Sequence, residues 1–136
     1  MKTKQNPFFL YWLPVVALCL ALFVQSCFPS PDIGPAFPSK DKVVHMAAYG
    51  LLAVLFYRAC RAARSGRWPP SRLLMIGVCF STLCGASDEL HQALVASRQA
   101  DAYDLLADFA GSVLGVVGYM AVTATRGIDG RAKMKP

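Results

Sequence analysis

Charged residues are scarce in this chain. Only 16% of its 136 residues are Asp, Glu, Lys or Arg, whereas 55% are apolar and the mean hydropathy is +0.41. This composition excludes intrinsic disorder, and it is too poor in charge for an ordinary soluble domain of this length. A large soluble enzyme is excluded as well, which leaves a small integral membrane protein.

Several chemical signatures are also missing from the sequence. The five cysteines form no C-x-x-C pair, so zinc and redox motifs are excluded and we expect buried free thiols. The sequence has no internal repeat, no low-complexity tract and no glycine-rich phosphate loop. No serine or cysteine accompanies a histidine in the pattern of a nucleophile with its base.

Four long apolar segments are present instead. They predict membrane-spanning helices at about residues 8–28, 42–60, 72–92 and 104–125. The second and third apolar runs, 43–57 and 73–87, are too short to cross a bilayer unless the helices continue into polar residues. We therefore expect an all-α bundle of four transmembrane helices, organised as an N-terminal tail (1–7), a membrane domain (8–125) and a basic C-terminal tail (126–136).

The basic residues are distributed unevenly among the loops. Two precede the first span, five lie in the 58–72 loop and four in the C-terminal tail, whereas only Lys40, Lys42 and Arg98 lie in the other two loops. The positive-inside rule then predicts that both termini are cytoplasmic, with seven of the eight acidic residues outside. This distribution explains the net charge of +6 through membrane topology and contact with anionic lipids, without nucleic acid.

The first apolar segment has an alternative interpretation. It follows lysines and ends at Cys27, which is loosely similar to a secretory signal that precedes a lipidated cysteine. Gln25 fits such a signal poorly, and the apolar run is long for a signal. We favour an uncleaved first helix, with cleavage at Cys27 as the alternative.

Polar residues recur four positions apart at one end of three predicted helices, a spacing that places them on one helix face. The groups are Asp41, His45 and Tyr49 in the second helix, Asp88 and Gln92 in the third, and Asp104 and Asp108 in the fourth. In the predicted topology all of them lie at the outer end, and His45, Asp88 and Asp108 lie about one turn inside the hydrocarbon region. Ionisable groups at that depth are costly unless they are paired or face water, so they mark a candidate functional site.

These residue types permit several kinds of chemistry. His45 and Glu89 are the candidate catalytic residues of a general acid–base set. The candidate ligands of a divalent cation are His45, Asp88, Glu89 and Asp104. We expect Arg98 to bind a phosphate or carboxylate headgroup. In a purely structural alternative, Asp88, Arg98 and Asp104 form a buried ion-pair network that holds the outer loop.

Small residues form a ridge along the fourth predicted helix. Ala107, Gly111 and Gly115 follow each other at intervals of four, and Gly118 extends the ridge. Such a ridge lets another backbone approach closely. We expect it to pack inside the bundle, with a dimer surface as the alternative.

As an ordered set, these motifs resemble the VanZ-like family of small bacterial membrane proteins. The resemblance covers about residues 38–120 and is carried by Asp41, Lys42, His45, Tyr49, Asp88, Glu89, Gln92, Arg98 and Asp104, followed by Gly111-x-x-x-Gly115. Where the family has asparagine this chain has Asp108, and Ala96–Ser97 replaces the usual proline–glycine. The resemblance implies a multi-pass protein of the bacterial cytoplasmic (inner) membrane, a role in glycopeptide (teicoplanin) resistance, and these residues as binding residues, to which we add Asp108.

Three functions remain open. The first is an envelope protein whose outward polar pocket binds a membrane lipid or a lipid-linked cell-wall precursor. The second is a metal-assisted hydrolase or transferase that acts on a phosphorylated envelope lipid. The third is a structural subunit of a complex with another membrane protein. On the outer side, seven acidic residues face three basic ones, and this surplus favours a site for a ligand such as a cation.

Overall fold

The computed structural model describes residues 7–29, 38–64, 67–96 and 99–132. The elements are α1 (Pro7–Ser26), α2 (Lys40–Arg64), α3 (Pro70–Gln92) and α4 (Ala102–Ala132). No strand occurs among the described residues. The predicted all-α fold is confirmed, whereas the predicted binding residue Arg98 lies outside the described residues.

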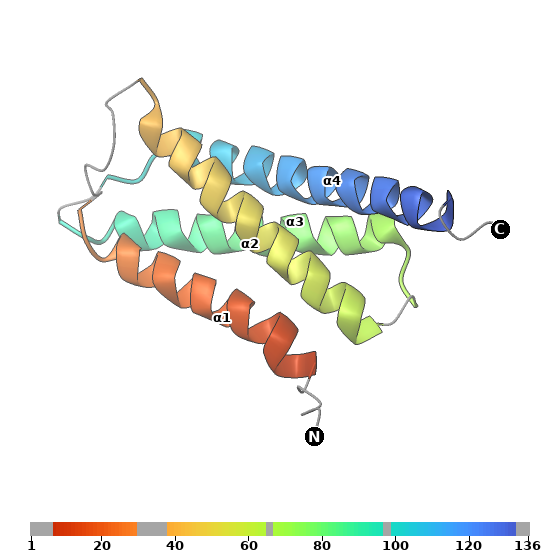
Figure 1. Ribbon diagram of the computed structural model, residues 1–136. Helices are drawn as coiled ribbons and strands as arrows, with labels where there is room; N and C mark the ends of the chain where they lie inside the picture. The colour runs from red at the N-terminus through yellow and green to blue at the C-terminus, as the bar shows by residue number, and fades with distance from the viewer. Residues whose placement is uncertain (1–6, 30–37, 65–66, 97–98, 133–136) are drawn as a thin grey trace.

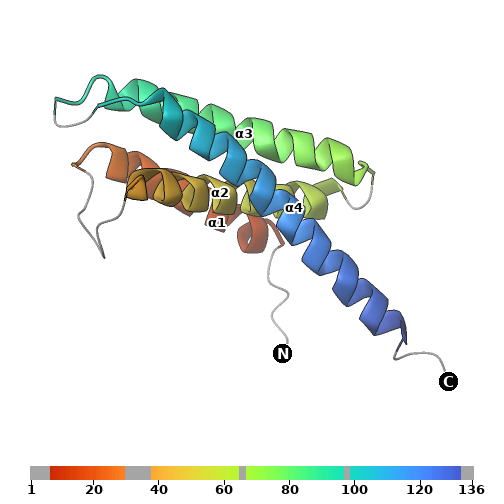
Figure 2. The same ribbon diagram turned by 90° about the horizontal axis from the view of Figure 1, so that it is seen from above.

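The four helices run up and down between two ends of an elongated bundle. Figure 1 shows that α2 and α4 begin at the end where α1 and α3 finish, while the two chain ends lie at the opposite end. Seen from above in Figure 2, α4 crosses over the bundle and extends beyond it towards the C-terminus. We call the first end the cluster end, because it carries the predicted polar groups of α2, α3 and α4.

All four helices are long and apolar enough to cross a membrane. The candidate spans are Phe8–Ser26, Lys40–Arg64, Pro70–Gln92 and Ala102–Thr125. As expected, α2 and α3 continue into polar residues on both sides of their short apolar runs. The helix of α4 extends to Ala132, so part of the expected tail at 126–136 is helical. A helix ends where its backbone hydrogen bonds end, which need not coincide with the end of its apolar sequence.

Much of the apolar surface faces outwards, as a bilayer requires. Exposed large apolar side chains occur on every helix and include Phe9, Leu20, Leu51, Met75, Leu83, Leu106 and Leu114. All five cysteines are free, but only Cys60 is buried, and Cys79 is exposed on α3. The expectation of buried thiols is therefore wrong for Cys79. A thiol behaves as a small apolar group, so it can occupy a position on the outside of a membrane helix.

The closest contact in the bundle joins α2 to α4. A Cβ atom at Gly111 would overlap the backbone of Met46. A Cβ atom at Gly50 would lie 2.8 Å from the carbonyl oxygen of Gly111, and one at Gly115 would lie 2.7 Å from that of Gly50. The small-residue ridge therefore packs inside the bundle. Gly118 does not take part, because a Cβ there would meet nothing within 4 Å.

The apolar core lies between this glycine contact and the remaining helices. Leu52, Ala53 and Val116 are fully buried there. The α1 helix joins the bundle mainly through α2. There the ring of Trp12 packs edge-on against that of Phe56, with the ring centroids 5.7 Å apart. This core fixes the positions of α2, α3 and α4 at the cluster end.

Candidate functional site

The α2 helix places three polar side chains at increasing depth. Asp41 is exposed, His45 is mostly buried with 13% of its side chain accessible, and Tyr49 is fully enclosed. The rings of His45 and Tyr49 stack with their centroids 5.9 Å apart. The predicted common face is therefore present, and it leads from the end of the bundle into its interior.

Lys42 connects the start of α2 to the start of α4. Its Nζ lies 2.9 Å from Asp41 Oδ2, 2.8 Å from Asp101 Oδ2 and 2.9 Å from Asp104 Oδ1. One ammonium group carries three N–H donors, so all three are used by carboxylates. Lys42 is therefore paired with acids of the protein itself and has no N–H donor left for an incoming anion.

Asp101 is a member of the site that sequence reasoning missed. It lies just before α4, where its Oδ1 accepts a hydrogen bond from the backbone N–H of Tyr103 at 2.9 Å. The hydrogen bond from Lys42 is the largest of the effects that hold the pKa of Asp101 below its ordinary value. An aspartate directly before a predicted helix is a common N-terminal cap, and that signal was available in the sequence.

His45 is oriented by two carboxylates of α4. Its Nδ1 lies 3.0 Å from Asp108 Oδ1, and its Nε2 lies 3.9 Å from Asp104 Oδ2. Because a carboxylate accepts, the short contact assigns the ring proton to Nδ1. Nε2 then carries a lone pair, and its separation from Asp104 is too long for a hydrogen bond.

Asp108 is fully buried where the third and fourth helices meet. A Cβ at Gly85 would overlap the Asp108 carboxylate, so the absence of a side chain at Gly85 provides the space for this acid. The second oxygen, Oδ2, has no hydrogen-bond partner among the residues that the structure describes. Asp108, which stands where the family has asparagine, is thus a buried carboxylate that positions His45.

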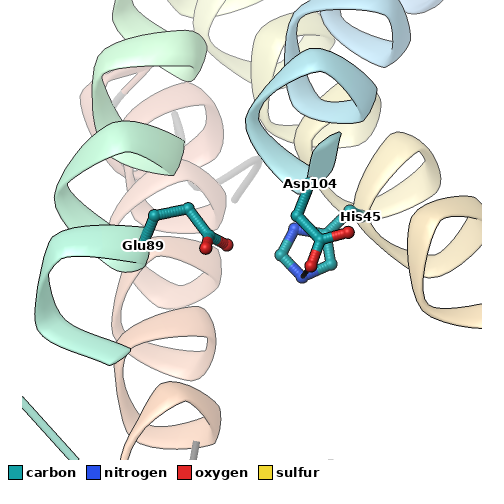
Figure 3. Close-up of side chains that lie close together, drawn as sticks. All are labelled: His45, Glu89 and Asp104. Carbon is teal, nitrogen blue, oxygen red and sulfur yellow. Dashed lines mark ion pairs between the residues drawn. The ribbon is translucent and has the colours of Figure 1, made fainter. Parts of the chain in front are cut away.

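Glu89 approaches the same region from α3. Its Oε2 accepts a hydrogen bond from the backbone N–H of Asp101 at 2.8 Å. Its Oε1 is buried and has no hydrogen-bond partner in the described part of the chain. In Figure 3 the carboxylate of Glu89 points towards His45 and Asp104. The Glu89 carboxylate therefore faces the centre of the site and carries one oxygen with an unused lone pair.

The other predicted residues of α3 form a separate pair. Gln92 Nε2 donates to Asp88 Oδ2 at 3.0 Å, as their spacing of four predicts. Asp88 is thus hydrogen-bonded to Gln92 beside His45 and its acids, and it belongs to neither of the two candidate metal-binding sets described next.

Among the described residues, two sets of side chains are arranged so that they can hold a metal ion. The first is His45, Glu89 and Asp104, and the second is Asp41, Asp101 and Asp104, in each case with ligand atoms within 4.8 Å of one another. The second set already has the Lys42 ammonium group among its oxygens. The first set combines an imidazole nitrogen with two carboxylates, which suits divalent metal ions, and the same groups can act in acid–base chemistry.

Together these features define a class of protein: a four-helix membrane protein with a buried acid–histidine cluster at one end. The VanZ/LLP1 family matches residues 8–123, and the chain belongs to this family. The suspected VanZ-like membership is therefore confirmed. Neither the comparison with curated proteins nor that with solved structures gives a significant match.

Proposed function

We propose that this protein resides in the bacterial cytoplasmic membrane and binds the phosphorylated headgroup of an envelope lipid or lipid-linked cell-wall precursor. Binding takes place in the outward-facing polar site at the cluster end. The positive-inside rule supports this orientation, since five arginines from Arg58 to Arg72 lie where α2 ends and α3 begins, at the opposite end of the bundle. Arg98, which lies between α3 and α4 in the sequence, remains a proposed contact to the headgroup.

The observation that carries the proposal is the unused Oε1 of Glu89. Glu89 is 8% exposed, and this oxygen has no partner among the described residues. Folded proteins rarely leave a buried carboxylate oxygen without a hydrogen bond, because its desolvation is not compensated. A bound ligand that satisfies this oxygen accounts for its retention.

The surroundings of the site favour a lipid over a soluble ligand. Leu90 and Leu94 near the end of α3 are highly exposed, as are Tyr103 and Leu106 near the start of α4. In a bilayer these apolar side chains lie against acyl chains beside the polar groups. A lipid with its headgroup at the cluster end can therefore keep its tail in the membrane.

A thermal-shift series on the detergent-purified chain tests the proposal. The probes are a polyprenyl phosphate and its parent polyprenol, and phosphatidic acid with its parent diacylglycerol, all in the presence of Mg²⁺ and Mn²⁺. We expect the two phosphate lipids to raise the melting temperature of the wild type and the two neutral lipids to have no effect. Equal shifts with both members of each pair, or no shift with any lipid, contradict headgroup binding.

Glycopeptide tolerance is part of the same proposal. A protein that binds a lipid-linked precursor changes the amount that is accessible to a glycopeptide at the outer face. We expect cells that express the wild type to tolerate more teicoplanin than cells that express Glu89→Gln at the same level. Equal tolerance would limit the proposal to lipid binding.

The oriented His45 favours a second candidate, a hydrolase or transferase that acts on a phosphorylated lipid. A histidine whose Nδ1–H is held by a buried carboxylate is arranged as a general base at Nε2. Phosphate release from the lipids above is the test. This candidate predicts that His45→Ala and Glu89→Gln abolish turnover while the melting curve stays cooperative. Absence of turnover by the wild type contradicts it.

A further inference from the structure

We infer that His45, Glu89 and Asp104 form a binding site for one divalent first-row transition metal ion, Mn²⁺ or Zn²⁺, and that this ion joins the acidic cluster to a phosphate headgroup. The metal site stands on its own geometry. The bridging role rests on the proposed headgroup function, because an acidic cluster repels a phosphate unless a cation lies between them.

The three ligands come from three helices and converge. One nitrogen of His45 on α2, one oxygen of Glu89 on α3 and one oxygen of Asp104 on α4 all lie within 4.8 Å of one another. Figure 3 shows the Glu89 carboxylate facing the other two side chains from the opposite helix. Two ligands that each lie about 2.1 Å from one ion are at most about 4.2 Å apart. The 3.9 Å between His45 Nε2 and Asp104 Oδ2 falls within this limit.

The orientation of His45 is that of a metal ligand. A metal-bound histidine usually donates its other ring N–H to a carboxylate or carbonyl, which fixes the ring and its tautomer. Here Nδ1 lies 3.0 Å from Asp108 Oδ1, which leaves the lone pair of Nε2 available at 3.9 Å from Asp104 Oδ2. Asp108 is accordingly a positioning residue for this site.

The state of Glu89 is an observation separate from the spacing of the cluster. Its side chain is more than nine-tenths buried, and only one of its oxygens is used within the protein, by the N–H of Asp101. The carboxylate faces the set, and its Oε1 has no hydrogen-bond partner among the described residues. An acid that served only to hold α3 to the start of α4 would not require this second oxygen.

The distribution of Lys42 contacts distinguishes the two acidic sets. Lys42 Nζ lies within 2.9 Å of an oxygen of each acid in the second set, so that set already contains a cation. Asp104 belongs to both sets but divides its oxygens between them. Its Oδ1 contacts Lys42, whereas its Oδ2 faces His45. The first set thus keeps three ligand atoms that no ammonium group occupies.

The donor types select the class of ion. Carboxylate oxygens alone suit Mg²⁺ and Ca²⁺, whereas an imidazole nitrogen favours first-row transition ions. One nitrogen with two carboxylates also leaves coordination positions free for water or for phosphate oxygens. We therefore expect Zn²⁺ and Mn²⁺ to bind more tightly than Mg²⁺ and Ca²⁺.

The first experiment measures metal binding without any lipid. The full chain, purified in detergent and stripped with EDTA, is titrated with Mn²⁺, Zn²⁺, Mg²⁺ and Ca²⁺ by calorimetry, and the bound metal is counted by mass spectrometry. We expect one Mn²⁺ or Zn²⁺ per chain in the wild type. If neither Mn²⁺ nor Zn²⁺ binds at one ion per chain, the inference is overturned.

Variants then test which set holds the ion. Glu89→Gln removes one ligand with almost no change of shape, and we expect its affinity to fall by at least tenfold. The matched control Asp41→Asn alters only the second set, and its affinity should stay within twofold of the wild type. Asp108→Asn should weaken binding by about 10- to 100-fold through the orientation of His45. Wild-type affinity in Glu89→Gln, or a loss confined to Asp41→Asn, overturns the assignment.

A spectroscopic measurement on the wild type avoids dependence on variant folding. Electron spin-echo modulation of bound Mn²⁺ detects a directly coordinated imidazole nitrogen. We expect the signal of one histidine nitrogen, and its absence at one bound ion per chain overturns the assignment of His45.

The lipid experiment is then repeated with EDTA. If the wild type binds the ion but no phosphate lipid, the metal site stands and the headgroup function fails. If phosphate lipids still raise the melting temperature in EDTA, the headgroup function stands and the bridging ion is refuted. Inorganic phosphate is the final probe, and a shift equal to that of the phosphate lipids would assign the site to free phosphate.

Discussion

The two ends of this bundle handle charge in different ways. At the end that carries the chain termini, Arg64 and Arg72 are exposed, and each guanidinium lies 4.5 Å from the centre of the Trp68 ring. At the cluster end, Asp104 and Asp108 are buried, and Asp108 is fully enclosed. Exposed charges keep their contact with water, whereas buried ones must be paired or serve a ligand. This difference supports our proposals that the arginines set the topology and that the acids form a site.

The largest loss of stability is expected at the glycine contact between α2 and α4. Gly111→Ala places a methyl group on the backbone of Met46, and backbone cannot move aside as a flexible side chain can. We expect a loss of about 1–3 kcal/mol or more in the free energy of unfolding. The control Gly118→Ala meets open space and should leave the melting temperature unchanged or slightly higher. Equal effects of the two variants would contradict this packing.

The next effect concerns the buried acid of the cluster end. Asp108→Ala leaves the Nδ1–H of His45 without its acceptor and opens space beside Gly85. We expect a loss of about 1–3 kcal/mol in the free energy of unfolding. Asp108→Asn keeps an acceptor and should cost less, and exposed Asp41→Ala less still. A melting series in which Asp41→Ala matches Asp108→Ala would remove the distinction between buried and exposed acids.

Lys42→Gln tests whether the two acidic sets at the cluster end differ because Lys42 occupies one of them. It removes the ammonium group that three carboxylates share, so we expect a lower melting temperature in EDTA. Added Mn²⁺ should then stabilise this variant more than it stabilises the wild type, because the second acidic set becomes free for a cation. A smaller stabilisation than in the wild type would show that Lys42 does not compete with cations.

Asp101 predicts a small dependence on pH. Because Lys42 lowers its pKa, Asp101 contributes stability that is complete above the ordinary aspartate pKa of about 3.9 and is lost as the pH falls through the lowered pKa. The difference in melting temperature between the wild type and Asp101→Asn should therefore be constant above about pH 5 and shrink below about pH 4. A difference that grows as the pH falls would have the wrong sign.

The smallest effect is expected at the arginine end. Arg64→Gln removes an exposed cation from the face of Trp68, and we expect a change of about 0.5–1 kcal/mol or less. The same melting series measures it. A loss as large as that of Asp108→Ala would show that the arginine end is also a structural element.

The fold was predictable because hydrophobicity and charge act at the scale of whole segments. Runs of apolar residues placed the four spans, and the spacing of four predicted that His45, Asp104 and Asp108 would share one end of the bundle. The same rule predicted the Gln92–Asp88 hydrogen bond within α3. These predictions depend only on local sequence, either on the length of an apolar run or on spacing along one helix.

The pairing of individual groups could not be predicted, because it depends on how the helices rotate against one another. Nothing in the sequence indicated that Lys42 would bond three acids, or that Gly85 would make room for Asp108. Asp101 was missed because it lies outside the apolar spans, although its position before α4 is typical of a helix cap. Asp88 was grouped with the metal candidates because it lies at the same end of the bundle, and the structure shows its hydrogen bond with Gln92.

The central claim is that the cluster end is a binding site rather than a structural lock, and the melting temperature of Glu89→Gln tests it most directly. In EDTA we expect the variant to be at least as stable as the wild type, because glutamine removes an uncompensated buried charge and keeps the acceptor for Asp101. With Mn²⁺ added at a concentration near the wild-type Kd, the wild type should gain more stability than the variant. A variant that is less stable in EDTA, together with no response of the wild type to Mn²⁺, would establish a structural lock and contradict the account.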